Sequence, residues 1–474
     1  MTRTPPIDPA LIRNVVLVGP SRGGKTTLVE GLARATGASS GRGGVTEGAA
    51  RGEPEDGLSL TPLDWQGHRL NILDTHGYAD AVGEVRAGLR AADAALFVVS
   101  ASEGVDPATT LLWDECEAVG MPRAIVLTKA DHDEADVEGT VEECQDLFGG
   151  GQGVLPLYLP LHSDDEIVAG LIAILTLRIR DYSTGSCVDR APDPQHLDLI
   201  ADARSALLEL IITASEDEHL MDMFLSGGDI AMAGLVSGME QAVRSGHLYP
   251  LLVTTTSPEG LGMEELLDVL VKAFPSPRDP SPPMVTAPDG SPREPLACDP
   301  DGPLCAEVVQ TVSSSGDGTS CLVRVFSGTL RPDMHLHVAG LHSVTRVVTT
   351  PPTATSLGAG DMGAVMDIPG AETGVTLSSP DHPLLLEPWG MPHPRHPVTI
   401  RDHSPEDVEG LVLALRQMAL EDPSLTLEVT VETGQILLWC MDEAHADVIS
   451  ERLSTRHGIS VTIETPRVDP ASTT

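Results

Sequence analysis

The pattern of apolar and polar positions divides the chain into three parts. Residues 1–275 alternate short, wholly apolar segments with longer segments whose apolar positions recur at helical spacing. This alternation predicts an α/β domain, in which a mainly parallel sheet carries helices on both faces. Apolar runs without polar interruption are typical of central parallel strands. The strands that we expect are 15–18, 58–63, 70–73, 94–100, 123–128 and 251–254.

A long stretch interrupts the alternation before the last of these strands. Residues 163–249 look mainly helical, with apolar stretches at 167–177 and 206–212. We therefore expect a helical insertion of about 163–249 within the first domain, residues 1–275.

The rest of the chain predicts two smaller domains after a linker. Residues 276–303 are rich in proline and have no periodicity, which favours a linker or an extended surface strap. Short alternating segments with glycine and proline turns predict a β-barrel at 304–390. Residues 396–468 read strand, helix, two strands, helix and strand, which predicts a small α+β, ferredoxin-like domain.

A glycine-rich loop follows the first predicted strand. Residues 19–27 fit the phosphate-binding pattern G-x-x-x-x-G-K-[ST], and helical spacing begins directly after it. In such a loop, backbone N–H groups and the helix N-terminus hold phosphate oxygens. Lys25 is expected to neutralise the β- and γ-phosphates, and Thr26 to offer its hydroxyl to Mg²⁺. The predicted nucleotide-binding residues of the loop are Gly19, Pro20, Ser21, Arg22, Gly23, Gly24, Lys25, Thr26 and Thr27.

A P-loop does not distinguish ATP from GTP, so the base must be read elsewhere. Residues 128–131 read Thr-Lys-Ala-Asp directly after a predicted strand. Asp131 can accept two hydrogen bonds from guanine that adenine cannot offer, and Thr128 and Lys129 complete this motif. The segment Thr254, Thr255 and Thr256, at the end of the last predicted strand, is expected to finish the base pocket mainly through backbone N–H groups, with Thr255 and Thr256 as the predicted binding residues. The sequence therefore predicts GTP and GDP as ligands.

A third loop, at the end of another predicted strand, supplies metal and phosphate contacts. Asp74 lies where ligands of open α/β sheets bind, and we expect it to hold Mg²⁺ through a water molecule. The Gly77 N–H is expected to bond the γ-phosphate only while that phosphate is present. Ser59 is a candidate second hydroxyl for the metal. The predicted metal residues are Thr26, Ser59 and Asp74.

These motifs, their order and the domains that follow resemble the translation-factor GTPases, in particular bacterial elongation factor G and most closely its divergent actinobacterial-type paralogue. Residues 325–330, 421–423 and 441–447 carry further similarity. The resemblance implies a GTPase that docks at the factor-binding site of the ribosome, with local contacts to ribosomal RNA.

Two departures from the family pattern concern hydrolysis. Elongation factor G has a histidine after the glycine of the third loop, where this chain has Tyr78, a poor base at neutral pH. His76 is a candidate substitute. Arg22 replaces the family's aspartate and is a candidate positive charge supplied in cis, the alternative being an exposed arginine without a catalytic role. The predicted catalytic residues are thus Lys25, Gly77, Tyr78 and Arg22.

Slow GTP hydrolysis is the activity that we expect from this set. The alternative is a sensor or decoy module that binds GTP without significant hydrolysis. The family continues into fourth and fifth domains, whereas this sequence stops shortly after the third. That difference favours a role other than ordinary translocation, such as a three-domain release- or recycling-type ribosomal GTPase.

Charge narrows the range of partners. The net charge is −41, from 29 Lys and Arg against 70 Asp and Glu, and there is no basic run. Affinity for a phosphate backbone depends on Lys and Arg clusters, so we expect no DNA partner and only local contact with RNA. No apolar run is long enough for a membrane helix, which predicts a cytoplasmic protein without a membrane partner. Nothing in the sequence indicates a homo-oligomer, and we expect a monomer.

Overall fold

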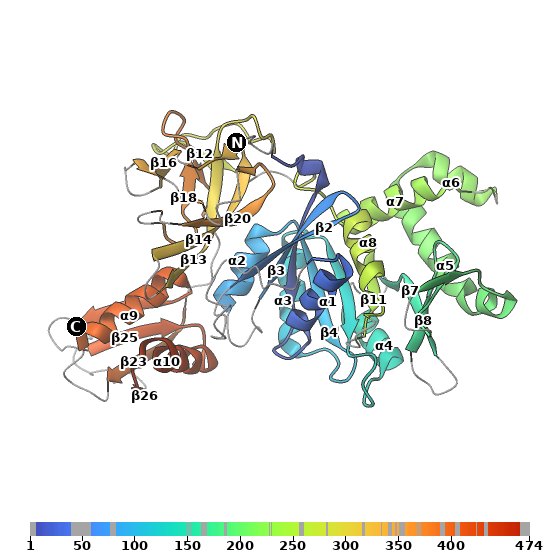
Figure 1. The fold of residues 1–474 in the computed structure, drawn as a ribbon, viewed down its shortest axis with the longest axis horizontal. Helices are drawn as coiled ribbons and strands as arrows, with labels where there is room; N and C mark the ends of the chain where they lie inside the picture. Colours follow the sequence, from blue (N-terminus) through green and yellow to red (C-terminus); the bar gives the residue numbers. More distant parts are fainter. Residues whose placement is uncertain are drawn as a thin grey trace, which may run out of the picture.

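The computed structural model of the chain consists of an α/β domain with an insertion on one side and two further units on the other (Figure 1). The residues that the structure describes are 6–38, 58–75, 82–148, 150, 153–162, 168–183, 187–226, 228, 230–255, 260–280, 283–314, 318–332, 334–339, 344–346, 348–349, 356–366, 368, 371–388, 394–402, 408–422, 424–430 and 435–464.

A mixed seven-stranded sheet forms the centre of the first domain. Its strand order is β2-β3-β1-β4-β5-β11-β6, and all neighbours are parallel except the antiparallel pair β2 and β3. The α/β fold expected from the sequence is therefore present. The strands are β1 (Ile12–Val18), β2 (Ser59–Trp65), β3 (His68–Asp74), β4 (Ala94–Ser100), β5 (Arg123–Thr128), β6 (Val154–Pro156) and β11 (Tyr249–Val253).

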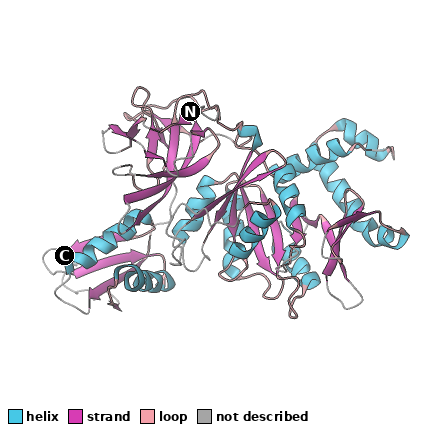
Figure 2. Ribbon diagram, in the orientation of Figure 1, coloured by secondary structure: helices cyan, strands magenta, loops and turns pink. Residues whose placement is uncertain are grey.

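Helices cover both faces of this sheet (Figure 2). Alternate residues of the fully buried β1 point to opposite faces, so Val15 belongs to one core and Val16 to the other. One core is closed by α1 (Lys25–Ala35) and α8 (Met263–Ala273). The other is closed by α2 (Val82–Ala91), α3 (Pro107–Ala118) and α4 (Val137–Leu147).

The insertion differs from the sequence-based expectation in its first part. Within the stretch 167–177, expected as helix, residues 168–173 form β8 of an antiparallel sheet with the order β10-β9-β8-β7, and residues 174–177 form a turn. A short apolar run fits a buried strand as well as a helix, and Ile172 and Ile179 pack here against Ile200. The elements are β7 (Tyr158–His162), β8 (Val168–Ala173), β9 (Arg178–Asp181) and β10 (Val188–Arg190), then helices α5 (Pro194–Ser215), α6 (Glu218–Leu225) and α7 (Met232–Arg244).

The second unit is rich in β-structure, and the proline-rich strap is attached to it. The strap strand β12 (Val285–Thr286) pairs with β22 (Leu385–Leu386). The largest sheet has the order β17-β16-β21-β13-β14-β20-β18, beside a small β15-β19 pair. These strands are β13 (Cys305–Ser314), β14 (Gly318–Ser327), β15 (Thr329–Leu330), β16 (His335–Val338), β17 (Val344–Arg346), β18 (Val348–Thr349), β19 (Leu357–Gly358), β20 (Met362–Met366) and β21 (Thr376–Ser378).

The third unit has the β-α-β-β-α-β order of ferredoxin-like folds. Its sheet order is β24-β25-β23-β26, which places the first and third strands in the centre. The elements are β23 (His396–Asp402), α9 (Val408–Glu421), β24 (Thr426–Thr430), β25 (Gln435–Cys440), α10 (Glu443–His457) and β26 (Val461–Glu464).

Buried polar contacts join the first two units. The Asn14 side chain in β1 donates to the Asp93 carboxylate at 2.7 Å and to the Gly360 carbonyl at 2.9 Å. The Arg324 guanidinium of β14 donates to Asp93 at 2.9 Å, and both of these side chains are less than one-tenth exposed. Burial raises the pKa of Asp93, and the charge of Arg324 opposes that rise. These contacts attach the second unit to the amino ends of β1 and β4, which lie away from the P-loop.

The third unit packs against the start of α2. Gly83 lies so close to Asp422 and Ser424 that a β-carbon at this position would collide with the Asp422 carboxylate. Asp422 is itself held by the ring of His445 at 3.2 Å and by the Ser424 N–H at 2.8 Å. A rigid polar turn of the third unit therefore contacts the first turn of this helix.

Candidate nucleotide-binding site

The P-loop forms a tight turn between β1 and α1. A β-carbon at Gly19 would collide with the Val98 carbonyl, and Gly24 has φ 94°, a left-handed conformation that glycine adopts without strain. The buried Lys25 ammonium donates to the carbonyls of Gly19 at 3.0 Å and Pro20 at 2.9 Å. These bonds hold the loop curled around the start of the helix.

The N-terminus of α1 faces into this loop. Its N-cap, Gly24, provides no side-chain hydrogen bond to the first turn. The backbone N–H groups of that turn, together with the helix dipole, therefore form an anion site of the kind that binds phosphate. Ser21, Thr26 and Thr27 are exposed around it.

Two of the predicted metal residues lie in direct contact. The Thr26 hydroxyl donates to the Asp74 carboxylate at 2.8 Å. Ser59 is paired with Asp74 across β2 and β3, so both side chains lie on the same face of the sheet. A set of hydroxyl and carboxylate oxygens beside a phosphate site fits Mg²⁺, which prefers oxygen ligands.

The guanine motif is tied to the P-loop through Thr128. Its buried hydroxyl donates to the Gly23 carbonyl at 2.6 Å. The next residue, Lys129, has a left-handed backbone with φ 58°, and its ammonium donates to Glu103 at 2.9 Å. Asp131 is exposed beyond it. The hydrogen bond of Thr128 therefore fixes the position of the predicted base-reading segment relative to the P-loop.

The loop after β11 differs from expectation at Thr255. Its N–H, expected to face the base, donates instead to the Leu261 carbonyl at 3.2 Å. Gly262, with φ 86°, lies directly against the Val253 carbonyl, where a β-carbon would collide, and this close approach places Leu261 beside the end of β11. Thr254, the first residue of this threonine segment, donates its hydroxyl to the Leu127 carbonyl at 3.0 Å and so joins β11 to β5.

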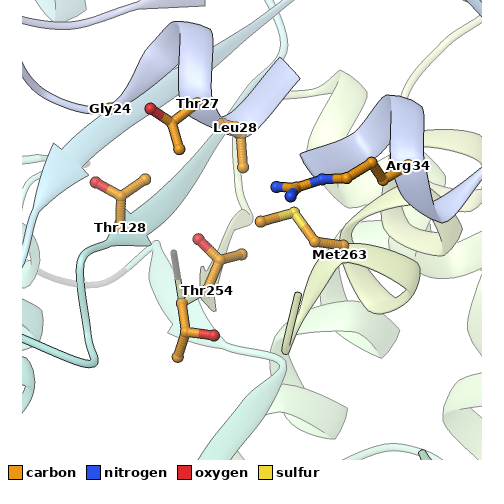
Figure 3. A pocket seen from close by; sticks show the side chains of 8 residues that line it. Gly24, Thr27, Leu28, Arg34, Thr128, Thr254 and Met263 are labelled. Carbon is orange, nitrogen blue, oxygen red and sulfur yellow. The ribbon is translucent and has the colours of Figure 1, made fainter. Parts of the chain in front are cut away.

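A small pocket opens between α1, α8 and the ends of β5 and β11 (Figure 3). Thr128 and Thr254 lie on one side, and Arg34 and Met263 point in from the two helices. Arg34, Met263 and Leu28 gave no signal in the sequence beyond ordinary helix positions. The lining residues are Gly24, Thr27, Leu28, Arg34, Thr128, Thr254, Thr255 and Met263.

The remaining candidates fall into two groups. Gly77, Tyr78, His76 and Thr256 lie outside the described residues. Arg22 lies within them, is exposed, and has a left-handed backbone with φ 68°. The described part of the site therefore brings together the P-loop, the predicted metal residues and the predicted base motif along one rim of the sheet. This arrangement is that of a P-loop nucleotide-binding domain.

Comparison with known proteins identifies the family. The family described as elongation factor Tu GTP binding domain matches residues 10–276, and that described as elongation factor G, domain III, matches residues 391–465. The chain is 44% identical over 489 residues to an elongation factor G-like protein of Mycobacterium tuberculosis, covering 96% of this chain and 67% of that protein. The chain belongs to the translation-factor GTPases of the elongation factor G-like family.

More distant relatives agree. Elongation factor G 1 of Geobacter sulfurreducens is 29% identical over 486 residues, covering 98% of this chain and 69% of that protein. A crystal structure of a Thermus thermophilus protein superposes with a TM-score of 0.79 at 31% identity, covering 97% of this chain and 68% of the other. Within the described ranges, every helix is too short or too polar to cross a bilayer.

Proposed function

We propose that this GTP-binding protein hydrolyses GTP slowly and does so in association with the ribosome. The contact between Thr26 and Asp74 is the observation that supports nucleotide chemistry most directly, because it joins the P-loop to the third loop where Mg²⁺ and the γ-phosphate would meet. The family relationship supports the ribosome as the partner.

Each residue of the site has a defined part in this proposal. Lys25 would exchange its loop carbonyls for the β- and γ-phosphate oxygens, and the N-terminus of α1 would hold the remaining phosphate charge. Thr26, Asp74 and Ser59 would hold Mg²⁺, which neutralises phosphate charge when bound. Asp131 would select guanine, with Thr128 keeping its loop against the P-loop.

We expect hydrolysis to be slow because Tyr78 occupies the position of the residue that orients the attacking water in the family. Tyr78 stands where the family has histidine, and a phenol neither accepts a proton readily at neutral pH nor carries positive charge. The second candidate function, a GTP sensor without significant hydrolysis, is favoured by the same substitution. The cytoplasmic location, the monomeric state and local contact with ribosomal RNA remain predictions, as do the domain limits at residues 275, 304, 390, 396 and 468.

Nucleotide titration and turnover test the proposal. We expect fluorescent GDP and GTP to bind saturably at millimolar Mg²⁺, ATP not to compete, and purified bacterial ribosomes to stimulate GTP hydrolysis above the rate of the protein alone. Lys25→Ala should abolish nucleotide binding. Lys272→Ala is the matched control, because Lys272 is a partly exposed lysine of α8 that pairs with Asp268.

Two outcomes would decide against parts of the proposal. Binding that survives Lys25→Ala would contradict the assignment of the P-loop. Normal binding with turnover that ribosomes leave unchanged would favour the sensor.

A further inference from the structure

Strand β13 of the second unit contains a β-bulge at Val309. In the pairing with β14, Val308 lies opposite Val323 and Gln310 lies opposite Leu322, so Val309 is an extra residue without a partner position. A bulge of this kind bends the strand and changes which face the following side chains point to.

Because of the bulge, the neighbouring residues Val309 and Gln310 both point away from the core of the second unit. In a regular strand, residues three positions apart, such as Glu307 and Gln310, would point to opposite faces. Here Val308 lies in the core of the second unit, whereas Val309 packs in the core of the first domain. Both Glu307 and Gln310 consequently reach the first domain, where Glu307 contacts the last turn of α2 and Gln310 contacts the residue before Ser59.

Gln310 contacts the start of β2. Its side-chain carbonyl oxygen accepts the Leu58 N–H at 2.7 Å, and both residues are 5% exposed. Leu58 packs beneath α2, where a β-carbon at Gly88 would lie 3.3 Å from its side chain. The following residue is Ser59, which is paired with Asp74. A single hydrogen bond therefore connects the second unit to the residue that precedes Ser59, one of the predicted metal residues.

Glu307 contacts α2. Its carboxylate is 1% exposed and accepts from Arg90, in the last turn of that helix, at 3.1 Å. Arg90 also donates to the Glu387 carbonyl at 3.0 Å. The bulged strand thus contacts both the start of β2, through Gln310, and the last turn of α2, through Glu307.

We propose that Gln310 is a positioning residue of the nucleotide site. By accepting the Leu58 N–H, it fixes the start of β2 so that Ser59 faces Asp74 and Thr26, and it thereby increases the part of GTP affinity that depends on Mg²⁺. This inference rests on the proposed GTP and Mg²⁺ site. It extends that site to a positioning residue in the second unit.

The test compares Gln310→Met, which keeps the volume but removes the acceptor, with Gln310→Glu, which keeps the acceptor. The binding of a non-hydrolysable GTP analogue is measured with millimolar Mg²⁺ and with a chelator. Gln310→Met should weaken binding about tenfold with Mg²⁺, the equivalent of about 1.4 kcal/mol for a lost buried acceptor, and less than about twofold with the chelator. Gln310→Glu should restore most of the affinity.

A second readout follows the hydrogen bond itself. Hydrogen exchange at the Leu58 and Ser59 amides should be faster in Gln310→Met than in the wild type. Gln145→Met is the matched control, because Gln145 donates to the Val154 carbonyl in the first domain and should change neither measurement. Thermal unfolding confirms that each variant is folded.

The possible failures are distinct. Equal loss of affinity with Mg²⁺ and with the chelator, unchanged affinity, or unchanged exchange at Leu58 would each overturn the positioning role of Gln310. A wild-type chain that binds no nucleotide would instead overturn the proposed function, and hydrogen exchange would still decide whether Gln310 holds Leu58.

Discussion

The Arg452 guanidinium of α10 donates to the Glu84 carboxylate, in the first turn of α2, at 2.9 Å. The two side chains are 14% and 6% exposed, so the ion pair is shielded from solvent. Helix α2 begins directly after the segment that contains Gly77 and Tyr78. The third unit is therefore attached to the element that follows the predicted γ-phosphate loop.

Removing one partner of this pair should loosen the third unit. Arg452→Ala takes the counter-charge from a buried carboxylate, which costs about 3–5 kcal/mol in comparable pairs. We expect a lower midpoint of urea unfolding and a larger radius of gyration in solution scattering. Arg401→Ala is the control, since Arg401 pairs with Glu464 on the exposed surface. A variant as compact and stable as the wild type would contradict the role of this contact.

Asp422 should make the stability of the third unit sensitive to acid. Burial alone would raise the pKa of Asp422, but the hydrogen bond and charge of His445, with the Ser424 donors, lower it below the usual carboxyl range. Because the pKa of Asp422 is lower in the folded than in the unfolded chain, its ionisation stabilises the folded state at pH values above the unfolded pKa of about 3.9. This stabilisation is lost as the pH falls through the pKa of the folded state.

The measurement is urea unfolding of wild type and Asp422→Asn across that range. The variant should be less stable at about pH 6, and the difference should shrink progressively below about pH 4. A difference independent of pH would show that the asparagine acts through packing alone.

Thr128 should contribute to nucleotide affinity through the P-loop rather than through the base. Thr128→Val keeps the shape but removes the donor to the Gly23 carbonyl, a buried bond whose loss costs about 1 kcal/mol. We expect about fivefold weaker GDP binding in fluorescence titration. Thr128→Ser keeps the hydroxyl and should bind nearly as the wild type does, whereas equal losses in both variants would contradict the hydroxyl's role.

Arg22 combines a left-handed backbone with a candidate catalytic charge, and two variants separate these properties. Arg22→Gly removes both the guanidinium and the strain of about 1–2 kcal/mol, so the unfolding temperature should rise. Arg22→Ala removes only the guanidinium and should not stabilise. We expect ribosome-stimulated hydrolysis to slow in both. Unchanged turnover in Arg22→Ala would support an exposed arginine without a catalytic role.

Local sequence patterns predicted the elements that depend on local chemistry. The apolar run before Gly19 and the helical spacing after Thr27 correctly gave β1 and α1, and the Thr26 to Asp74 contact follows from two motifs at one rim of a parallel sheet. The described part of the stretch 167–177, which contains β8, was predicted wrongly as helix, because a short apolar run is compatible with both secondary structures and packing against α5 decides between them.

Contacts between distant segments could not be predicted in this way. Gln310 and Leu58 are 252 positions apart, and neither residue has a distinctive neighbourhood in the sequence. The bulge at Val309 leaves no mark in the alternation, because valine fits either face of a strand. The Thr255 N–H was misassigned because its partner, the Leu261 carbonyl, comes from the segment before α8, and nothing in the sequence marks that contact.

Gly83 allows the first domain and the third unit to lie in direct contact. With no β-carbon at this position, the backbone of α2 rests directly on the Asp422 carboxylate. Gly83→Ala would change no charge, but its methyl group would collide with the Asp422 carboxylate and force the helix and the carboxylate apart. The first turn of α2 and the Asp422 carboxylate can therefore keep this contact only while residue 83 has no side chain.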